Sequence, residues 1–78
     1  MPHYFFDVKD GGGALRDEAG LQLPGPDEAR AVALQAIGEV VKHEVPEGDH
    51  HEIAIDVREG DGPVILTAAL TLQITWVE

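Results

Sequence analysis

The chain has 78 residues, 44% of them hydrophobic, no cysteine, and a formal net charge of −10. That length allows one small domain, residues 1–78, and the composition is typical of a globular chain rather than a disordered one. The lack of cysteine excludes disulfides, thiolate-ligated metals and a thiol nucleophile, and we expect no cofactor.

The charge balance restricts the classes of partner. Fifteen Asp and Glu residues oppose five Lys and Arg residues, which are scattered along the chain. Because such a field repels phosphate groups, the sequence argues against binding to nucleic acid or to an anionic membrane surface. No apolar run reaches the roughly 18–20 residues that span a bilayer, and the N-terminus lacks the pattern of a secretory signal. We expect a cytoplasmic protein.

The first part of the chain predicts short strands joined by turns. Tyr4, Phe6 and Val8 alternate with their neighbours and share one face of an extended segment. The glycines at 11–13 are suited to a hairpin turn, because glycine readily adopts positive φ. We expect strands at residues 4–8, 14–17 and 21–23.

One amphipathic helix follows, from Ala29 to about Glu44, with its start in residues 23–28. Asp27 and Glu28 place negative charge at the positive end of the helix dipole, and Asp27 is a candidate cap. The predicted inner face consists of Ala33, Ile37, Val40 and Val41, spaced by three and four residues.

Two more strands complete the predicted fold. Ile53, Ile55 and Val57 indicate a half-buried strand, and residues 59–63 a second hairpin turn. The final segment alternates over thirteen residues, which exceeds the usual strand length and predicts a bend, a bulge or an overhang used for pairing. Its apolar row is Val64, Leu66, Ala68, Leu70, Leu72, Ile74 and Trp76. Trp76 is expected in the core more than at a contact surface.

The element order is therefore β-β-α-β-β. It predicts an α+β two-layer sandwich, an antiparallel sheet of about four strands with the helix packed on one face. A domain this small gains stability by pairing, so we expect a homodimer formed through the opposite sheet face or the long edge strand. Candidate self-association residues are Ile65, Ala69, Thr71 and Trp76.

Acidic residues concentrate between Glu44 and Asp61, where seven carboxylates accompany Arg58 alone. This acidic segment has two interpretations: a solvated surface that aids solubility, or a patch that binds a basic protein. The candidate patch residues are Glu47, Asp49, Glu52, Asp56 and Glu59.

No motif specifies catalysis. His50 and His51 have metal-binding chemistry, but adjacent strand residues point to opposite faces, so we expect no metal site. The glycine triplet lacks the following helix of a phosphate-binding loop. The chain has no serine to act as a nucleophile. We expect no enzymatic activity and no catalytic residues.

The sequence also resembles two known families. The opening residues 1–11, the segment Arg-Asp-Glu-Ala-Gly at 16–20, Leu23-Pro24 and residues 27–31 resemble a family of small uncharacterised alphaproteobacterial proteins, a domain of unknown function. That family implies no activity. The strands followed by Leu-Pro-Gly and an alanine-rich helix are also similar, at the level of the fold, to the sheet-plus-helix domain of HicB-type antitoxins.

Two functions follow as hypotheses. The first is a small acidic interaction or regulatory module without enzymatic activity that associates with itself. The alternative is an acidic inhibitor that blocks a basic surface, toxin-like or nucleic-acid-binding, of a partner protein.

Overall fold

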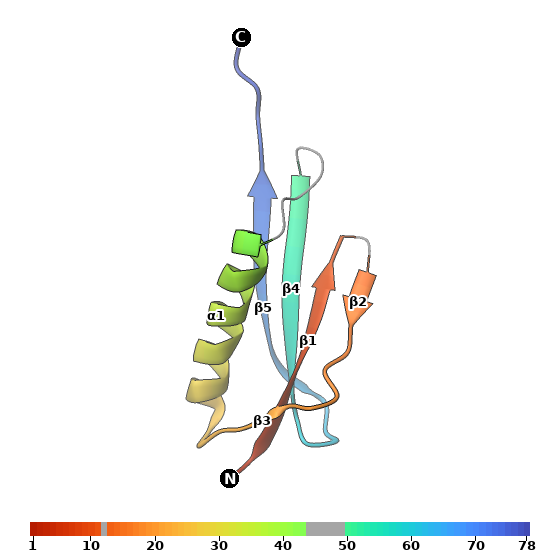
Figure 1. Ribbon diagram of the computed structural model, residues 1–78, viewed down its shortest axis with the longest axis vertical. Coiled ribbons are helices and arrows are strands. Elements are labelled where there is room, and N and C mark those ends of the chain that lie inside the picture. Colours follow the sequence, from red (N-terminus) through yellow and green to blue (C-terminus); the bar gives the residue numbers. More distant parts are fainter. Residues whose placement is uncertain (12, 44–49) are drawn as a thin grey trace.

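A computed structural model describes residues 1–11, 13–43 and 50–78, which form an antiparallel sheet with one helix across it (Figure 1). The elements are β1 (His3–Asp10), β2 (Gly13–Leu15), β3 (Leu21–Gln22), α1 (Pro26–His43), β4 (His50–Glu59) and β5 (Val64–Gln73). The predicted α+β fold is confirmed.

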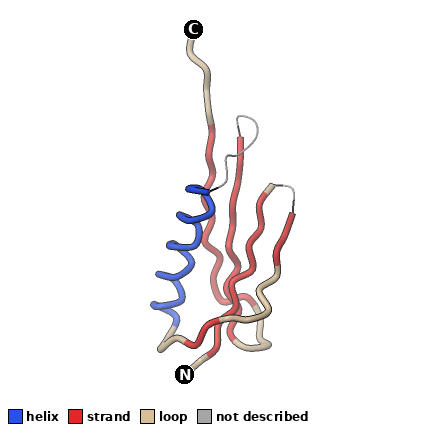
Figure 2. The backbone as a smooth tube through the Cα atoms, viewed as in Figure 1, coloured by secondary structure: helices blue, strands red, loops and turns tan. Residues whose placement is uncertain are grey.

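The sheet has the strand order β2-β1-β4-β5, and every pairing in it is antiparallel (Figure 2). The two-residue strand β3 pairs with the first residues of β1, so β2 and β3 together line one edge of the sheet. Among the residues that the structure describes, strand β5 alone forms the other edge. One edge is therefore short and interrupted, whereas the other is a ten-residue strand.

The helix begins one residue before the predicted cap. Pro26 is its first residue, where the missing N–H of proline costs nothing, and the carbonyl of Gly25 accepts a hydrogen bond from the Ala29 N–H at 3.2 Å. Asp27 and Glu28 consequently lie inside the first turn, where they favour the helix dipole. The prediction of Asp27 as the cap is wrong.

The core lies between α1 and the sheet, over β1 and β4, and Leu66 and Ala68 of β5 pack against it partly buried. Tyr4 of β1 is buried with the alternating residues of β4 against three small or branched side chains of the helix. Alanines on the helix let its backbone approach the sheet closely. Val41, placed on the inner face by its spacing, is instead 40% exposed on one flank of α1. The buried set is Tyr4, Ala29, Ala33, Ile37, Ile53, Ile55 and Val57.

Strand β5 contains the predicted irregularity. Val57 pairs with Leu66 but Arg58 pairs with Val64, so Ile65 is the extra residue of a bulge. Because Val64 lies opposite Arg58, it does not belong to the apolar row that begins at Leu66, and that part of the prediction is wrong.

The C-terminal segment beyond β5 forms an overhang, one of the predicted alternatives, and its use for pairing stays a prediction. Residues 74–78 continue in the direction of the strand and project past every other element (Figure 1). They account for much of the 53 Å length of a molecule that is only about 20 Å across.

Candidate functional site

The outer face of the sheet, opposite the helix, carries an ion pair between neighbouring strands. Arg58 of β4 donates from Nε to Asp7 Oδ2 at 2.7 Å and from a terminal nitrogen to Asp7 Oδ1 at 3.1 Å. The two side chains are only 12% and 17% exposed. This bidentate geometry fixes both side chains, and Arg58 also donates to the Asp17 carbonyl at 3.2 Å.

Asp17 joins the loop before β3 to the edge of β1. Its Oδ2 accepts the Phe6 N–H at 3.0 Å, and its Oδ1 accepts the N–H groups of Ala19 and Gly20, each at 3.1 Å. The Asp17 N–H in turn donates to Asp7 Oδ1 at 2.9 Å. Phe6 lies between the residues of β1 that pair with β2 and those that pair with β3. The carboxylate therefore replaces the strand partner that β1 lacks there.

An aromatic stack continues this network toward the start of β1. The rings of His3 and Phe5 lie 4.9 Å apart and nearly parallel, and the Arg58 guanidinium lies 4.9 Å from the centre of the Phe5 ring. Nε2 of His3 donates to the Ala19 carbonyl at 2.8 Å. Phe5 is thus half-buried between two side chains and supports the loop.

A second polar cluster spans three strands of the outer face. Lys9 of β1 contacts Asp56 of β4 at 2.7 Å, and the Thr67 hydroxyl of β5 donates to the same carboxylate at 2.8 Å. Asp56 was predicted as part of a patch that binds another protein, but its carboxylate already contacts Lys9 and Thr67 of the same chain.

The other predicted patch residues do not gather around Asp56. Glu52 and Glu59 are exposed, but they lie seven residues apart on β4, about 23 Å at the rise of a strand. Glu47 and Asp49 lie outside the described residues. The described members are distributed along β4 and form no compact acidic surface.

The carboxylates of these clusters have lowered pKa values. The hydrogen bond from Arg58 lowers the pKa of Asp7, against a smaller opposing effect of burial. For Asp17, burial raises the pKa, but the backbone N–H donors of Gly20, Phe6 and Ala19 together outweigh it. The hydrogen bonds from Lys9 and Thr67 lower the pKa of Asp56. All three shifts favour the ionised form in the folded state.

These shifts predict acid sensitivity. A carboxyl whose pKa is lower when folded stabilises the protein above its unfolded pKa, about 4, and this contribution is lost as the pH falls through the folded pKa. We expect the urea midpoint to fall between pH 5 and pH 2.5, although protonation also relieves the repulsion of a −10 chain. Asp56→Asn should show a smaller fall than the wild type. A midpoint that stays constant or rises over this range would contradict the prediction.

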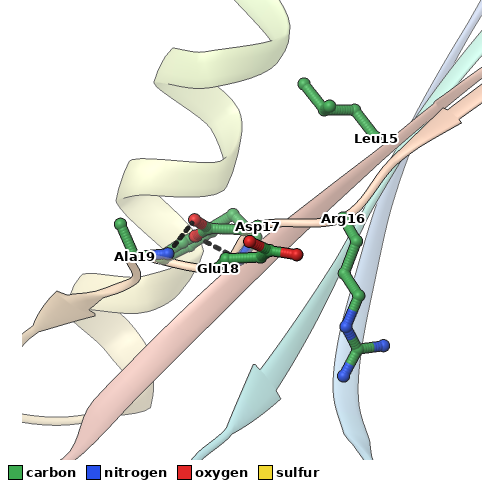
Figure 3. A pocket seen from close by; sticks show the side chains of 6 residues that line it. Leu15, Arg16, Asp17, Glu18 and Ala19 are labelled. Atoms are coloured by element: carbon green, nitrogen blue, oxygen red, sulfur yellow. Dashed lines mark hydrogen bonds between the residues drawn. The ribbon is translucent and has the colours of Figure 1, made fainter.

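A shallow hollow lies beside the Asp17 loop (Figure 3). Its lining includes Leu15, Arg16, Asp17 and Glu18. Figure 3 shows the Arg16 side chain directed away from the two carboxylates, while the Asp17 oxygens accept hydrogen bonds drawn as dashed lines. The hollow is open to solvent, and its one partly buried acid is already engaged by the backbone. This arrangement supports a structural role for the segment at 16–20.

The histidines do not come together. His3 stacks on Phe5, and His43 pairs with Glu39 one turn earlier on α1 at 3.1 Å. His50 and His51 are adjacent on β4, the first exposed and the second half-buried. Within residues 1–11, 13–43 and 50–78, no group of three potential metal ligands is assembled.

The free edge at β5 is the largest concentration of exposed apolar side chains. Leu70 and Leu72 are 43% and 39% exposed although they point to the helix side, and Val41 of α1 lines a small apolar pocket with them. Trp76 is 82% exposed on the projecting tail, against the expectation that it lies in the core. No charged residue occurs between Asp61 and Glu78.

The predicted self-association residues lie along this edge. Ala69 and Thr71 are exposed on the outer face, Ile65 forms the bulge, and Trp76 lies on the tail. Sequence reasoning missed the exposed residues on the helix side, because periodicity assigned all but Leu34 of them to the core face and left Leu34 unassigned. The length of the last alternating segment was the signal that could have revealed their exposure, because this segment is longer than the part of a strand that one helix covers. The missed residues are Leu34, Val41, Leu70, Leu72 and Ile74.

The fold and its polar network define a small α+β domain whose specific side chains hold a loop against a sheet edge. The chain belongs to the family described as a domain of unknown function, DUF6894, which matches residues 3–71. No curated protein and no solved structure gave a significant match. Among the residues that the structure describes, no helix has both the length and the apolar character needed to cross a membrane.

Proposed function

We propose that this protein is a small interaction or regulatory module without enzymatic activity that associates with itself, acting in the cytoplasm of an alphaproteobacterium. The observation that carries the proposal is the free edge of β5 with its tail. Natural proteins protect exposed edge strands with charges, proline or shortness, and β5 has none of these between Val64 and Gln73. Such an edge is suited to receive another strand.

The polar groups of the described residues support a non-enzymatic role. The carboxylates with lowered pKa values, Asp7, Asp17 and Asp56, all accept hydrogen bonds from within the chain. A general base needs its carboxylate free to reach a substrate. These groups instead stabilise the fold.

Self-association is tested by adding charge to one edge at a time. We expect sedimentation equilibrium at about 5–200 μM, the range of weak to moderate dimers, to show a monomer–dimer equilibrium for the wild type. Ile74→Asp/Trp76→Asp changes two exposed residues beyond the folded body and should give a monomer. Leu15→Asp/Leu21→Asp adds the same charge at two exposed positions of the opposite edge and should dimerise normally. A wild type that stays monomeric would overturn the proposal.

The alternative, an antitoxin-like acidic inhibitor of a basic surface, rests on the surface charge. The chain carries a net charge of −10, and two of its five cations, Lys9 and Arg58, are paired with carboxylates, so thirteen carboxylates and three cations remain. An inhibitor of this kind would bind a basic partner with an affinity that falls steeply as salt increases. The test measures the binding of a basic protein to the wild type and to Glu52→Gln/Glu59→Gln at low and at high salt. Weaker binding of the variant at low salt, together with loss of wild-type binding at high salt, would support this alternative.

A further inference from the structure

We infer that the occupant of the β5 edge is the same edge of a second copy, paired antiparallel about a two-fold axis at Thr71. The two tails then cross, and each covers the other chain's β5. This inference rests on the proposed self-association and specifies its geometry.

Charge restricts the part of the surface at which two copies can meet. Each chain carries a net charge of −10, so most contacts between two copies bring carboxylates together. The run from Gly62 to Val77 is the long uncharged part of the sequence, and the structure places it on a free edge. Two copies can meet along this run without placing a charged side chain between the strands.

The register follows from the bulge and the tail. Residues directly opposite in an antiparallel pair point to the same face, so a symmetric pairing joins residues whose numbers have an even sum. The regular part of the edge starts at Leu66, after the bulge, and the apolar alternation ends at Trp76. Pairing this whole run with itself places Leu66 opposite the partner's Trp76, so the numbers of any two facing residues add to 142. Thr71 then faces the partner's Thr71, and the two-fold axis passes between them.

The side chains that meet in this register are chemically matched. On the helix side, Leu66 faces the partner's Trp76, Ala68 faces the partner's Ile74, and Leu70 faces the partner's Leu72. On the outer side, threonines face threonines, and Ala69 faces the partner's Gln73. Charged Glu78 lies beyond the run.

The helices contribute to the same interface. A two-fold axis perpendicular to the sheet places both helices on the same face, so the flanks of α1 above β5 point toward each other. Val41 lines the pocket formed with Leu70 and Leu72, and Leu34, 50% exposed, lies two helical turns before it. The pairing therefore covers the exposed side chains that the single chain leaves on this side, and gives a continuous sheet β2-β1-β4-β5-β5-β4-β1-β2.

Engineered cysteines test the register directly, because the wild type has none. In Thr71→Cys the two introduced thiols lie opposite each other across the axis, within about 5.5 Å between Cβ atoms, and mild oxidation should convert most of the protein to a covalent dimer. Ala69→Cys is the matched control, exposed on the same face two residues earlier. Its thiols are separated by about four residues along the strands, roughly 13 Å, and should not join.

The tail is tested by mixing two variants. Thr67→Cys chains mixed with Thr75→Cys chains should form a disulfide between the two types of chain, whereas each variant alone should form none. Intact mass after oxidation identifies each product, and circular dichroism confirms that the variants fold.

The outcomes separate this inference from the proposed function. A wild type that dimerises while Thr71→Cys fails to join, or while Ala69→Cys joins instead, overturns this register and leaves self-association standing. A wild type that is monomeric overturns both. Disulfides at 71 and between 67 and 75, with none in the controls, support the crossed-tail dimer.

Discussion

Replacing Asp17 with Ala is expected to cost about 2–4 kcal/mol of unfolding free energy, because three hydrogen bonds to a charged acceptor are lost and the part-buried Phe6 N–H is left without a partner. The Asp17 carboxylate accepts the N–H groups of Phe6, Ala19 and Gly20, and the Phe6 N–H has no strand partner on that side. For a domain of this size the loss corresponds to a decrease in Tm on the order of 10–20 °C. Thermal and urea unfolding followed by circular dichroism measure it.

Two further variants make this result specific. Asp17→Asn retains one acceptor oxygen and should fall between Asp17→Ala and the wild type. Glu18→Ala removes the neighbouring, exposed carboxylate and should change stability by less than about 0.5 kcal/mol, as surface substitutions do. Equal effects of the Asp17 and Glu18 variants would show that the loop is not held by the Asp17 carboxylate.

Gly20→Ala is expected to destabilise the protein by about 3 kcal/mol, since backbone strain is combined with a steric clash. Gly20 has φ of 67°, which side chains disfavour, and an added Cβ would lie 2.6 Å from the His3 ring and 2.7 Å from the Tyr4 carbonyl oxygen. The His3 ring can rotate away, but the carbonyl belongs to β1 and cannot move without disturbing the sheet. Urea unfolding at pH 7 measures the loss.

Gly60 is the matched control for this substitution. Its φ is 56°, similar to that of Gly20, but no heavy atom lies within 4 Å of an added Cβ. Gly60→Ala should therefore cost only the conformational term, about 1 kcal/mol. If both substitutions had the same effect, the close approach of the Gly20 loop to β1 would contribute nothing.

The regular elements were predictable because they depend on local periodicity. Alternation of Tyr4, Phe6 and Val8 indicated β1, and the spacing of Ala33 and Ile37 indicated α1. Boundaries were less predictable. Strand β4 begins at His50, three residues before its alternation starts, because pairing with β5 extends it.

The polar network on the outer face was not predictable from the chain. Asp7, Asp17 and Arg58 are separated by 10 to 51 residues, and nothing in their spacing indicates that they meet. The resemblance singled out the segment at 16–20, but gave it no role. The structure gives it one, because Asp17 and Gly20 close the gap in the edge of β1.

The sequence by itself determined the fold class, the helix, the net negative charge and the unusual length of the last alternating segment, since each of these is local in the chain or a sum over it. Only the tertiary structure decided which strand became the free edge. That choice depends on β4 inserting between β1 and β5, a pairing between distant segments. It also decided that Leu70, Leu72 and Trp76 are exposed, because one helix of eighteen residues is too short to cover the full length of the strand and its tail.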